Sequence, residues 1–369
     1  MNTKLTPAQV LRLRLQAQSL VASPHSTAAE VVQSMLALQG QDFAASHWAV
    51  GVRAPGATRK DVYAAYDAGE IIRSWPMRGT LHVVAPRDLG WMLELTTERL
   101  LHGIATRWRQ LGIDDAHLER ARSAARALLD GGGRATRAQF IRALEEAGVD
   151  SSGQRGYHTI WFLAQTGTIC WGPMVDDQQA LVLLDEWVPN PRKLDGSVAL
   201  GEFLRRYLSG HGPATLKDFA WWAKLTMRDA RTALEAVRDE LVEVHCGELD
   251  HWMLAEAAAT LDPDLPAARQ SVRALPSFDE HLLGYQNRNL QLDPEHADLI
   301  VPGGNGIFRP TIVVGGQVRG TWSRTKRADG TDVSVEAFAP LATRTAASCR
   351  RSVRDWSTFN DTAVRIELA

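Results

Sequence analysis

Apolar residues recur at helical spacing over the first forty residues of the chain. A helix capped by Thr6 carries its apolar side chains at Val10, Leu11, Leu13 and Leu15. A second helix is predicted to begin after Thr27 and to end at Gln39-Gly40. Two further helical segments follow, and residues 70–84 then predict a β-hairpin with Pro76 at its bend.

The same order of elements recurs twice further along the chain. Helix starts are predicted at Thr136, Thr215 and Thr226, and hairpins at residues 168–184 and 241–254. Helices followed by a small hairpin are typical of a winged helix-turn-helix. The repetition therefore predicts three such units in tandem. The alternative is an irregular helical protein whose hairpins are unrelated.

The pattern changes beyond a Pro-rich linker at Asp262–Pro266. Residues 307–324 form strand-like runs on either side of Gly315-Gly316, which predicts a hairpin with a two-glycine turn. Asp329-Gly330 predicts another turn, so we expect a small closed or half-closed β-barrel. Helical periodicity returns over about residues 339–358, and the expected fold class is α+β, mostly α.

The composition is that of a globular protein with several domains. The 369 residues exceed one ordinary core, and their 45% hydrophobic content contains no run long enough to span a membrane. The first residues enter a helix without the layout of a signal peptide. Three widely spaced cysteines, Cys170, Cys246 and Cys349, favour a reducing compartment. We therefore expect a cytoplasmic protein without membrane association.

The net charge of −2 does not by itself indicate nucleic-acid binding, but its distribution is uneven. Residues 99–142 hold nine arginines against four acidic residues, a net charge of +5. Residues 300–354 hold nine basic residues against three acidic ones, a net charge of +6. Local basic faces suit a surface that follows DNA phosphates, although ordinary solvated faces would have the same composition.

Two short polar stretches interrupt the apolar pattern. The first, Leu38-Gln39-Gly40-Gln41-Asp42, places two amides and a carboxylate at a junction between helices, where an unpaired amide costs free energy. The second is Arg78-Gly79-Thr80-Leu81-His82. Arg78, Thr80 and His82 alternate along one predicted strand and should share a face.

These stretches resemble the bacterial winged-helix DNA glycosylase superfamily, the AlkZ/YcaQ group. The resemblance covers about residues 5–360 and is carried by four segments: Leu36–Asp42, Trp75–His82, Phe278–Tyr285 and Gly315–Trp322. The superfamily divides by a motif of Gln, a small or aliphatic residue, then Gln or Asp. Gln39-Gly40-Gln41 is similar to the AlkZ-like branch, with glycine in place of the usual aliphatic residue.

The resemblance implies three winged-helix domains in a C shape, closed by a C-terminal β-barrel. The corresponding ranges are residues 1–110, 111–195, 196–262 and 263–369. It also implies hydrolysis of the N-glycosidic bond of N7- or N3-alkylated purines in double-stranded DNA, and in some members of bulky adducts or interstrand crosslinks. We expect a monomer that needs no cofactor or metal.

Gln39 and Gln41 are the predicted catalytic residues because their amides suit an easy leaving group. An N7-alkylated purine is cationic and departs neutral, so the protein has to place a water and stabilise the developing sugar cation. A glutamine carbonyl can accept a hydrogen bond from that water, but it cannot remove a proton at neutral pH. A junction tied by amide–backbone hydrogen bonds is the structural alternative for both residues.

Other polar residues also have two interpretations each. Asp42 is either a base or, as we prefer, the cap of the following helix. Asp279 and His281, with Glu280 between them, form either an acid–base set or a network that joins the linker to the barrel. Arg319, near the two-glycine turn, either enters a DNA groove or belongs to an ordinary barrel hairpin.

The second polar stretch has alternatives of the same kind. Arg78 could hold a phosphate and His82 could contact a base or water, or both could lie on a wing strand that packs internally. For the whole chain, a non-catalytic DNA-binding protein with regulatory or architectural function is the alternative to a glycosylase. A ligand-sensing protein that has lost DNA binding is a third interpretation.

Overall fold

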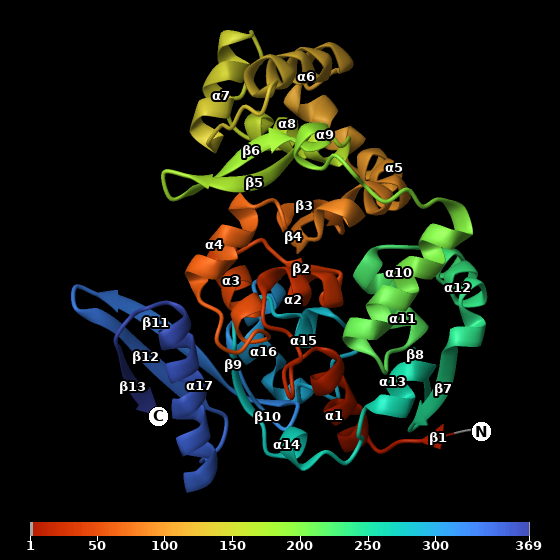
Figure 1. The fold of residues 1–369 in the computed structure, drawn as a ribbon, viewed down its shortest axis with the longest axis vertical. Helices are drawn as coiled ribbons and strands as arrows, with labels where there is room; N and C mark the ends of the chain where they lie inside the picture. The colour runs from red at the N-terminus through yellow and green to blue at the C-terminus, as the bar shows by residue number, and fades with distance from the viewer. Residues whose placement is uncertain (1–2, 369) are drawn as a thin grey trace. The chain divides into compact units, whose positions relative to one another are not determined.

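The computed structural model describes residues 3–368. Met1, Asn2 and Ala369, which the first and last expected domains include, lie outside the described residues. The chain forms two compact units (Figure 1): the larger unit contains the residues up to Val62 and from Gly201 onward, and the smaller unit runs from Tyr63 to Leu200. The chain passes between them within α4 (Arg59–Asp67) and within α10 (Gly196–His211).

The larger unit combines short helices with two main groups of strands. Its further α-helices are α1 (Pro7–Ala17), α2 (Ala28–Met35), α3 (Phe43–Gly51), α11 (Leu216–Ala223), α12 (Met227–Ala236), α13 (Ala255–Thr260), α14 (Pro266–Arg269), α15 (Glu280–Leu283), α16 (Ala297–Ile300) and α17 (Thr343–Phe359). Short 3₁₀ turns occupy Arg238–Glu240, Pro294–His296 and Pro302–Gly304. Its strands are β1 (Thr3–Lys4), β2 (Ala37–Gln39), β7 (Leu241–Cys246), β8 (Leu249–Leu254), β9 (Val272–Leu275), β10 (Thr311–Val314), β11 (Gln317–Arg327), β12 (Gly330–Ala337) and β13 (Val364–Leu368).

The predicted helix starts are confirmed by side-chain caps. At each of these starts, the threonine hydroxyl accepts the N–H of the third helical residue, and the side-chain oxygen of that residue accepts the threonine backbone N–H. The five positions are Thr6, Thr27, Thr136, Thr215 and Thr226. Each box satisfies N–H groups that have no partner within the helix. These helix starts are therefore fixed by local sequence alone.

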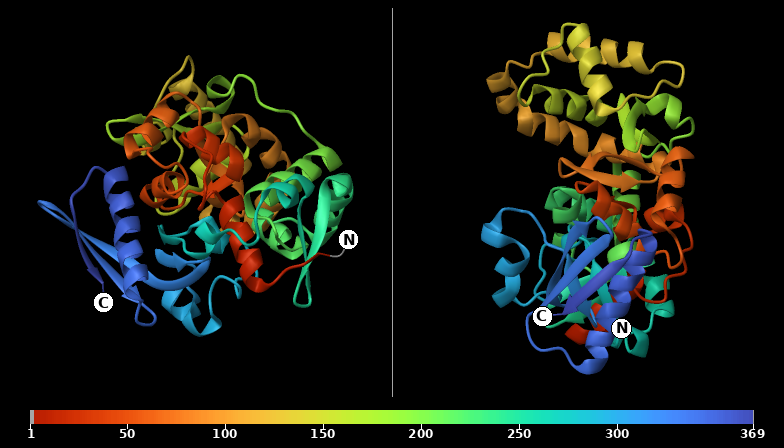
Figure 2. Two further views of the ribbon diagram at one scale, coloured as in Figure 1. Left: turned by 60° about the horizontal axis from the view of Figure 1, so that its bottom comes forward. Right: turned by 90° about the vertical axis from the view of Figure 1, so that its left-hand side faces the viewer.

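The C-terminal strands form an open sheet in the order β13-β12-β11-β10-β9. Among residues 3–368, β9 and β13 are its two edges, so the predicted closed barrel is wrong. The sheet is covered by a helix instead: α17 lies alongside its strands (Figures 1 and 2), the Ser352 hydroxyl accepts the Ala274 N–H at 2.8 Å, and Trp356 packs edge-on against Trp322. A helix that buries the apolar face removes the need for closure.

The two-glycine turn between β10 and β11 is confirmed, but it does not project into solvent. Gly315 donates its N–H to the Ser271 carbonyl at 2.9 Å. A Cβ on Gly316 would lie 2.9 Å from the Cβ of Leu11 on α1. The hairpin tip is therefore packed against α1 and against the turn at Ser271 within the larger unit.

The smaller unit is a helical cluster built on paired hairpins. Its further α-helices are α5 (Pro86–Leu111), α6 (Asp115–Leu129), α7 (Arg137–Glu146), α8 (Arg155–Gln165) and α9 (Leu184–Trp187), and its strands are β3 (Ile72–Met77), β4 (Thr80–Val84), β5 (Ile169–Val175) and β6 (Gln178–Leu183). The strands are neighbours in the order β4-β3-β5-β6. Trp75, Phe140 and Leu163 are among the buried residues of its core.

The first hairpin bends at a different place from the one predicted. Pro76 lies within β3, and the turn is formed by Arg78 and Gly79, whose φ angles are +56° and +68°. Two consecutive residues with positive φ match the twist of a hairpin, and Gly79 makes the second position easy to occupy. The ladder is irregular between Ser74 and Met77, which allows proline to lie inside the strand.

The three hairpins expected of winged units are all present, as β3–β4, β5–β6 and β7–β8. The third is extended by β1, which pairs parallel with β7.

Across residues 3–368, no helix has the length and apolar character needed to cross a membrane.

Candidate active site

The Gln-Gly-Gln motif, residues 39–41, lies at the end of a short buried strand and not at the end of a helix as predicted. Helix α2 stops at Met35 because Leu36 adopts φ +63° and ψ −50°, and residues Ala37–Gln39 form β2. These angles are close to those of a γ-turn, which is rare and strained for a residue with a side chain. Leu36 is fully buried, so the surrounding core holds the chain in this turn.

The two glutamines of the motif have different surroundings. The Gln39 side chain is buried, and its Oε1 accepts the backbone N–H of Gln41 at 2.7 Å. The Gln41 side chain is exposed. The junction interpretation therefore holds for the Gln39 oxygen, while the exposed Gln41 amide extends from a backbone that Gln39 fixes.

Asp42 caps α3, which is the role we preferred for it from the sequence. Its Oδ1 accepts the Ala45 N–H at 3.0 Å, and its Oδ2 accepts the Ser277 hydroxyl at 3.2 Å. Both oxygens thus have structural partners. The hydrogen bond to Ser277 also ties the motif to the segment that precedes α15.

Glu280 is the residue that binds the motif from within the core. It is 1% exposed, and its Oε1 accepts the Gln39 backbone N–H at 3.1 Å. Its Oε2 accepts the indole N–H of Trp222 at 2.8 Å. Because a carboxylate accepts strong hydrogen bonds from N–H donors, Glu280 fixes the peptide that carries the Gln39 side chain.

His211 completes the buried cluster around Glu280. Its Nε2 lies 3.4 Å from Glu280 Oε2, and its ring stacks on Tyr207 at a centroid distance of 4.7 Å. His211 Nδ1 lies 3.1 Å from the Tyr207 carbonyl, and since a carbonyl only accepts, Nδ1 carries a hydrogen. A Cβ on Gly284 would lie 2.4 Å from the imidazole, so the close approach of α15 requires glycine there.

Asp279 belongs to a buried ion pair and not to an acid–base set. Arg53, fully buried, donates to both Asp279 oxygens at 2.8 and 2.9 Å and also to the carbonyls of Ala49 and Gln18. A bidentate pair of this kind is satisfied on both sides. It anchors the start of α15 to the end of α3, so Asp279 is part of a structural network, but one that joins α15 to α3 and not the linker to the barrel as expected.

His281 has a structural role as well. It is fully buried, and burial lowers its pKa to about 4. Since the Gly316 carbonyl lies 2.9 Å from Nε2 and can only accept, the neutral ring donates from Nε2. Nδ1 has no hydrogen-bond partner in the described part of the chain, so a second proton there would be unsatisfied. His281 therefore connects α15 to the hairpin tip.

Arg78, Thr80 and His82 lie in the smaller unit. His82 is fully buried, and its Nδ1 lies 2.8 Å from the Thr80 carbonyl. Arg78 Nη2 lies 2.9 Å from His82 Nε2, and because a guanidinium only donates, Nε2 accepts and Nδ1 carries the hydrogen. His82 is thus a neutral residue that holds the Arg78 guanidinium against the hairpin turn, which agrees with internal packing of His82.

A basic cavity of about 500 Å³ lies beside the start of α3 in the larger unit, a few residues beyond the motif, whose own residues do not line it. Its lining includes Ala44, on the first turn of α3, and three basic residues of β11, Arg324, Lys326 and Arg327. Burial lowers the pKa of Arg324, and the nearby Asp42 opposes that effect. Arg319 is exposed further back on β11 and does not line this cavity. The basic residues that β11 contributes to this cavity therefore lie beyond Trp322.

Glu280 was predicted only as part of a cluster, and His211, Trp222 and Arg53 were not predicted as site residues. His211, Trp222 and Glu280 lie about 170 or more positions from the motif, and Arg53, which is nearer, acts through Asp279, 226 positions away from it, so no local signal could have identified this set. Residues 3–368 contain no group of three or more His, Cys, Asp or Glu side chains that could hold a metal ion.

The class of this protein follows from comparison with known families. A sequence profile described as DNA glycosylase AlkZ-like matches residues 32–359, and the chain belongs to that family of DNA glycosylases. It is 26% identical over 330 residues to the interstrand DNA cross-link repair glycosylase of Streptomyces sahachiroi, covering 85% of this chain and 86% of the relative. The solved structure of the Streptomyces sahachiroi DNA glycosylase AlkZ has a TM-score of 0.83 and 22% identity, and the whole of each chain is covered.

Proposed function

We propose that this chain hydrolyses the N-glycosidic bond of N7- or N3-alkylated purines in double-stranded DNA, with Gln39 and Gln41 as the catalytic pair. The proposal rests on two hydrogen bonds that hold the backbone of the motif in place. The Gln39 N–H is bound by buried Glu280 at 3.1 Å, and the Gln39 side chain binds the Gln41 N–H at 2.7 Å. The exposed Gln41 amide is thereby presented from a rigid backbone.

The proposed roles of the two amides follow from this arrangement. The Gln41 carbonyl accepts a hydrogen bond from the attacking water, and its dipole faces the sugar as positive charge develops. Gln39 fixes the orientation of Gln41. Neither amide can act as a base, so the reaction requires a leaving group that already carries a positive charge. Unmodified purines would therefore be excluded as substrates.

The basic cavity beside the motif supports a role in DNA binding. Arg324 and Lys326 supply positive charge from one strand, β11, to the cavity that Ala44 of α3 also lines, whereas Arg327 pairs with Asp332 at 2.6 Å. Such side chains would neutralise phosphates next to the damaged nucleotide. The recurring helix–hairpin pattern supports three winged-helix domains within the ranges predicted from sequence, and we propose that the protein acts as a monomer.

Bulky adducts and crosslinks fall within the proposed substrate range. The Streptomyces relative is named for interstrand cross-link repair. In this chain, the exposed position of Gln41 supports a substrate range that includes large lesions, because an exposed amide can reach a lesion without enclosing it in a pocket. Complete extrusion of the base into a tight pocket would then be unnecessary.

The test is base release from a duplex with one N7-methylguanine, followed by hot alkali to cleave abasic sites. Wild-type protein should cleave the strand at the lesion, and Gln39→Ala and Gln41→Ala should each lower the single-turnover rate by about 100-fold. Gln33→Ala is the matched control, since Gln33 is an exposed glutamine on α2 outside the motif. No release from this or a bulkier N7 adduct would refute the proposed substrate class. Full activity in both motif variants would refute the site.

A further inference from the structure

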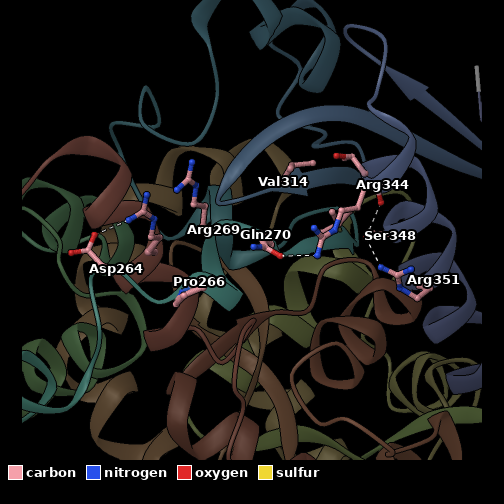
Figure 3. Close-up of a pocket in the computed structure, with 11 residues that line it drawn as sticks. Asp264, Pro266, Arg269, Gln270, Val314, Arg344, Ser348 and Arg351 are labelled. Carbon is pink, nitrogen blue, oxygen red and sulfur yellow. Dashed lines mark hydrogen bonds and ion pairs between the residues drawn. The ribbon is translucent and has the colours of Figure 1, made fainter.

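A second cavity in the larger unit, of about 710 Å³, is lined by four arginines from three separate helices (Figure 3). Arg12 comes from α1, Arg269 from the end of α14, and Arg344 and Arg351 from the first half of α17. We call this group the arginine pocket. Arginines from segments so far apart in sequence meet here only because the chain folds.

Most of the positive charge in the arginine pocket is not neutralised. Arg12 pairs with Asp264 at 2.9 Å. Within residues 3–368, Arg269, Arg344 and Arg351 form no ion pair with a carboxylate at 4.0 Å or less. One acidic residue against four arginines gives the lining a net charge of +3.

Neutral acceptors orient two of these guanidinium groups. Arg344 donates to the Gln270 side-chain oxygen at 3.2 Å, and Arg351 donates to the Ser348 hydroxyl at 2.5 Å (Figure 3). Each of these bonds uses one nitrogen of a guanidinium that has five N–H donors. The remaining donors stay available, so the bonds restrict the arginines without cancelling their charge.

The arginine pocket is distinct from the cavity beside the motif. Both adjoin α17, but the motif cavity is lined by Trp356 near the helix end, whereas Arg344 lies on the first turn. Arg351, the other arginine that α17 contributes to the arginine pocket, lies five residues before Trp356, about 7.5 Å along the helix axis. The two cavities share no lining residue.

We propose that the arginine pocket is a second phosphate-binding site. Planar guanidinium groups match phosphate oxygens with paired hydrogen bonds, and a lining with a net charge of +3 favours a ligand with several negative charges. A cavity of about 710 Å³ exceeds the size of a single phosphate, so the ligand is a polyphosphate or a stretch of backbone. The phosphates come either from DNA outside the lesion or from a free phosphate ester.

Two measurements distinguish the sources, with matched variants on one helix. The pocket variant combines Arg344→Ala and Arg351→Ala. The control combines Arg350→Ala and Arg354→Ala, which removes the same charge from exposed positions of α17 that do not line the cavity. Circular dichroism of both variants verifies that they are folded.

The first measurement is the salt dependence of binding to an undamaged duplex of about 30 base pairs. For DNA as the source, the slope of log K against log salt should fall by about one for each arginine–phosphate interaction that the pocket variant removes, and by less in the control. The second is thermal unfolding with inorganic pyrophosphate. For a free phosphate as the source, pyrophosphate should raise the Tm of wild type and control by about 5 °C, but not that of the pocket variant.

Either pattern supports the proposal. Equal slopes in the pocket and control variants, together with no pyrophosphate effect, would overturn it, because the charges would then act only as a diffuse positive surface. Neither measurement requires base excision. Failure of the proposed substrate class would therefore leave this test intact, and loss of the phosphate site would leave N7-methylguanine release as the separate test of catalysis.

Discussion

Replacing Glu280 by glutamine tests whether the buried carboxylate positions the catalytic motif. Both oxygens accept N–H groups, from Gln39 at 3.1 Å and from Trp222 at 2.8 Å. An amide has one accepting oxygen, so in either orientation its NH₂ faces a donor. Hydrogen bonds to charged groups contribute about 1.5–3 kcal/mol each, so Glu280→Gln should lower the free energy of unfolding by about 2–4 kcal/mol.

The same change should slow catalysis without removing any group that touches DNA. If the Gln39 peptide loses its anchor, a loss of about 1.5–3 kcal/mol in positioning corresponds to about a 10- to 100-fold slower excision step. The assay is single-turnover release of N7-methylguanine with protein in excess, at a temperature where the variant is folded. DNA affinity, measured separately, should stay within about twofold because no phosphate-binding group is altered.

Asp218→Asn is the matched control for the loss of stability. Asp218 is 1% exposed and accepts the backbone N–H groups of Thr215, Gln286 and Asn287 in the same unit. Its substitution should destabilise the fold by a similar amount and leave the excision rate of the folded protein unchanged. If Glu280→Gln excised as fast as Asp218→Asn, the positioning role of Glu280 would be refuted.

Three further predictions concern the segment around α15. Burial lowers the pKa of His281 to about 4, so this imidazole stays neutral in the folded protein, whereas in the unfolded chain it takes up a proton below about pH 6.5. The free energy of unfolding should therefore be unaffected by His281 above pH 6.5 and should fall by about 3 kcal/mol towards pH 4. Urea titrations of His281→Gln should have a shallower pH dependence. Gly284→Ala would place a Cβ 2.4 Å from His211, so its Tm should fall, and an unchanged Tm would contradict the packing described. Asp279→Asn leaves Arg53 buried without its bidentate partner and should lower the free energy of unfolding by about 3–5 kcal/mol, measured by chemical denaturation.

Local chemistry made several elements predictable from sequence. Each threonine cap is formed by residues three positions apart, and the Gly315-Gly316 turn requires only that both residues accept positive φ. Asp42 followed the same logic, since a carboxylate before a helix binds that helix's own N–H groups. These interactions are short in sequence, so the pattern of residue types was sufficient.

Predictions failed where distant segments compete with local preference. The apolar period of α2 continues through Leu38, yet the chain leaves the helix at Leu36 and continues as β2, where the Gln39 N–H binds Glu280. The expected barrel stayed open because α17 covers the sheet, an arrangement that no strand pattern encodes.

The sequence by itself determined the motif, the helix starts, the hairpins and the family, because these depend on residue identity and on neighbours along the chain. Only the tertiary structure decided which polar residues serve the motif. Asp279 and His281 became structural once Arg53 and the Gly316 carbonyl were placed against them, and Glu280 became the anchor of Gln39. The physical reason is that a buried polar group must find its partner in space, and the Gln39 N–H finds its partner in Glu280, 241 positions further along the chain.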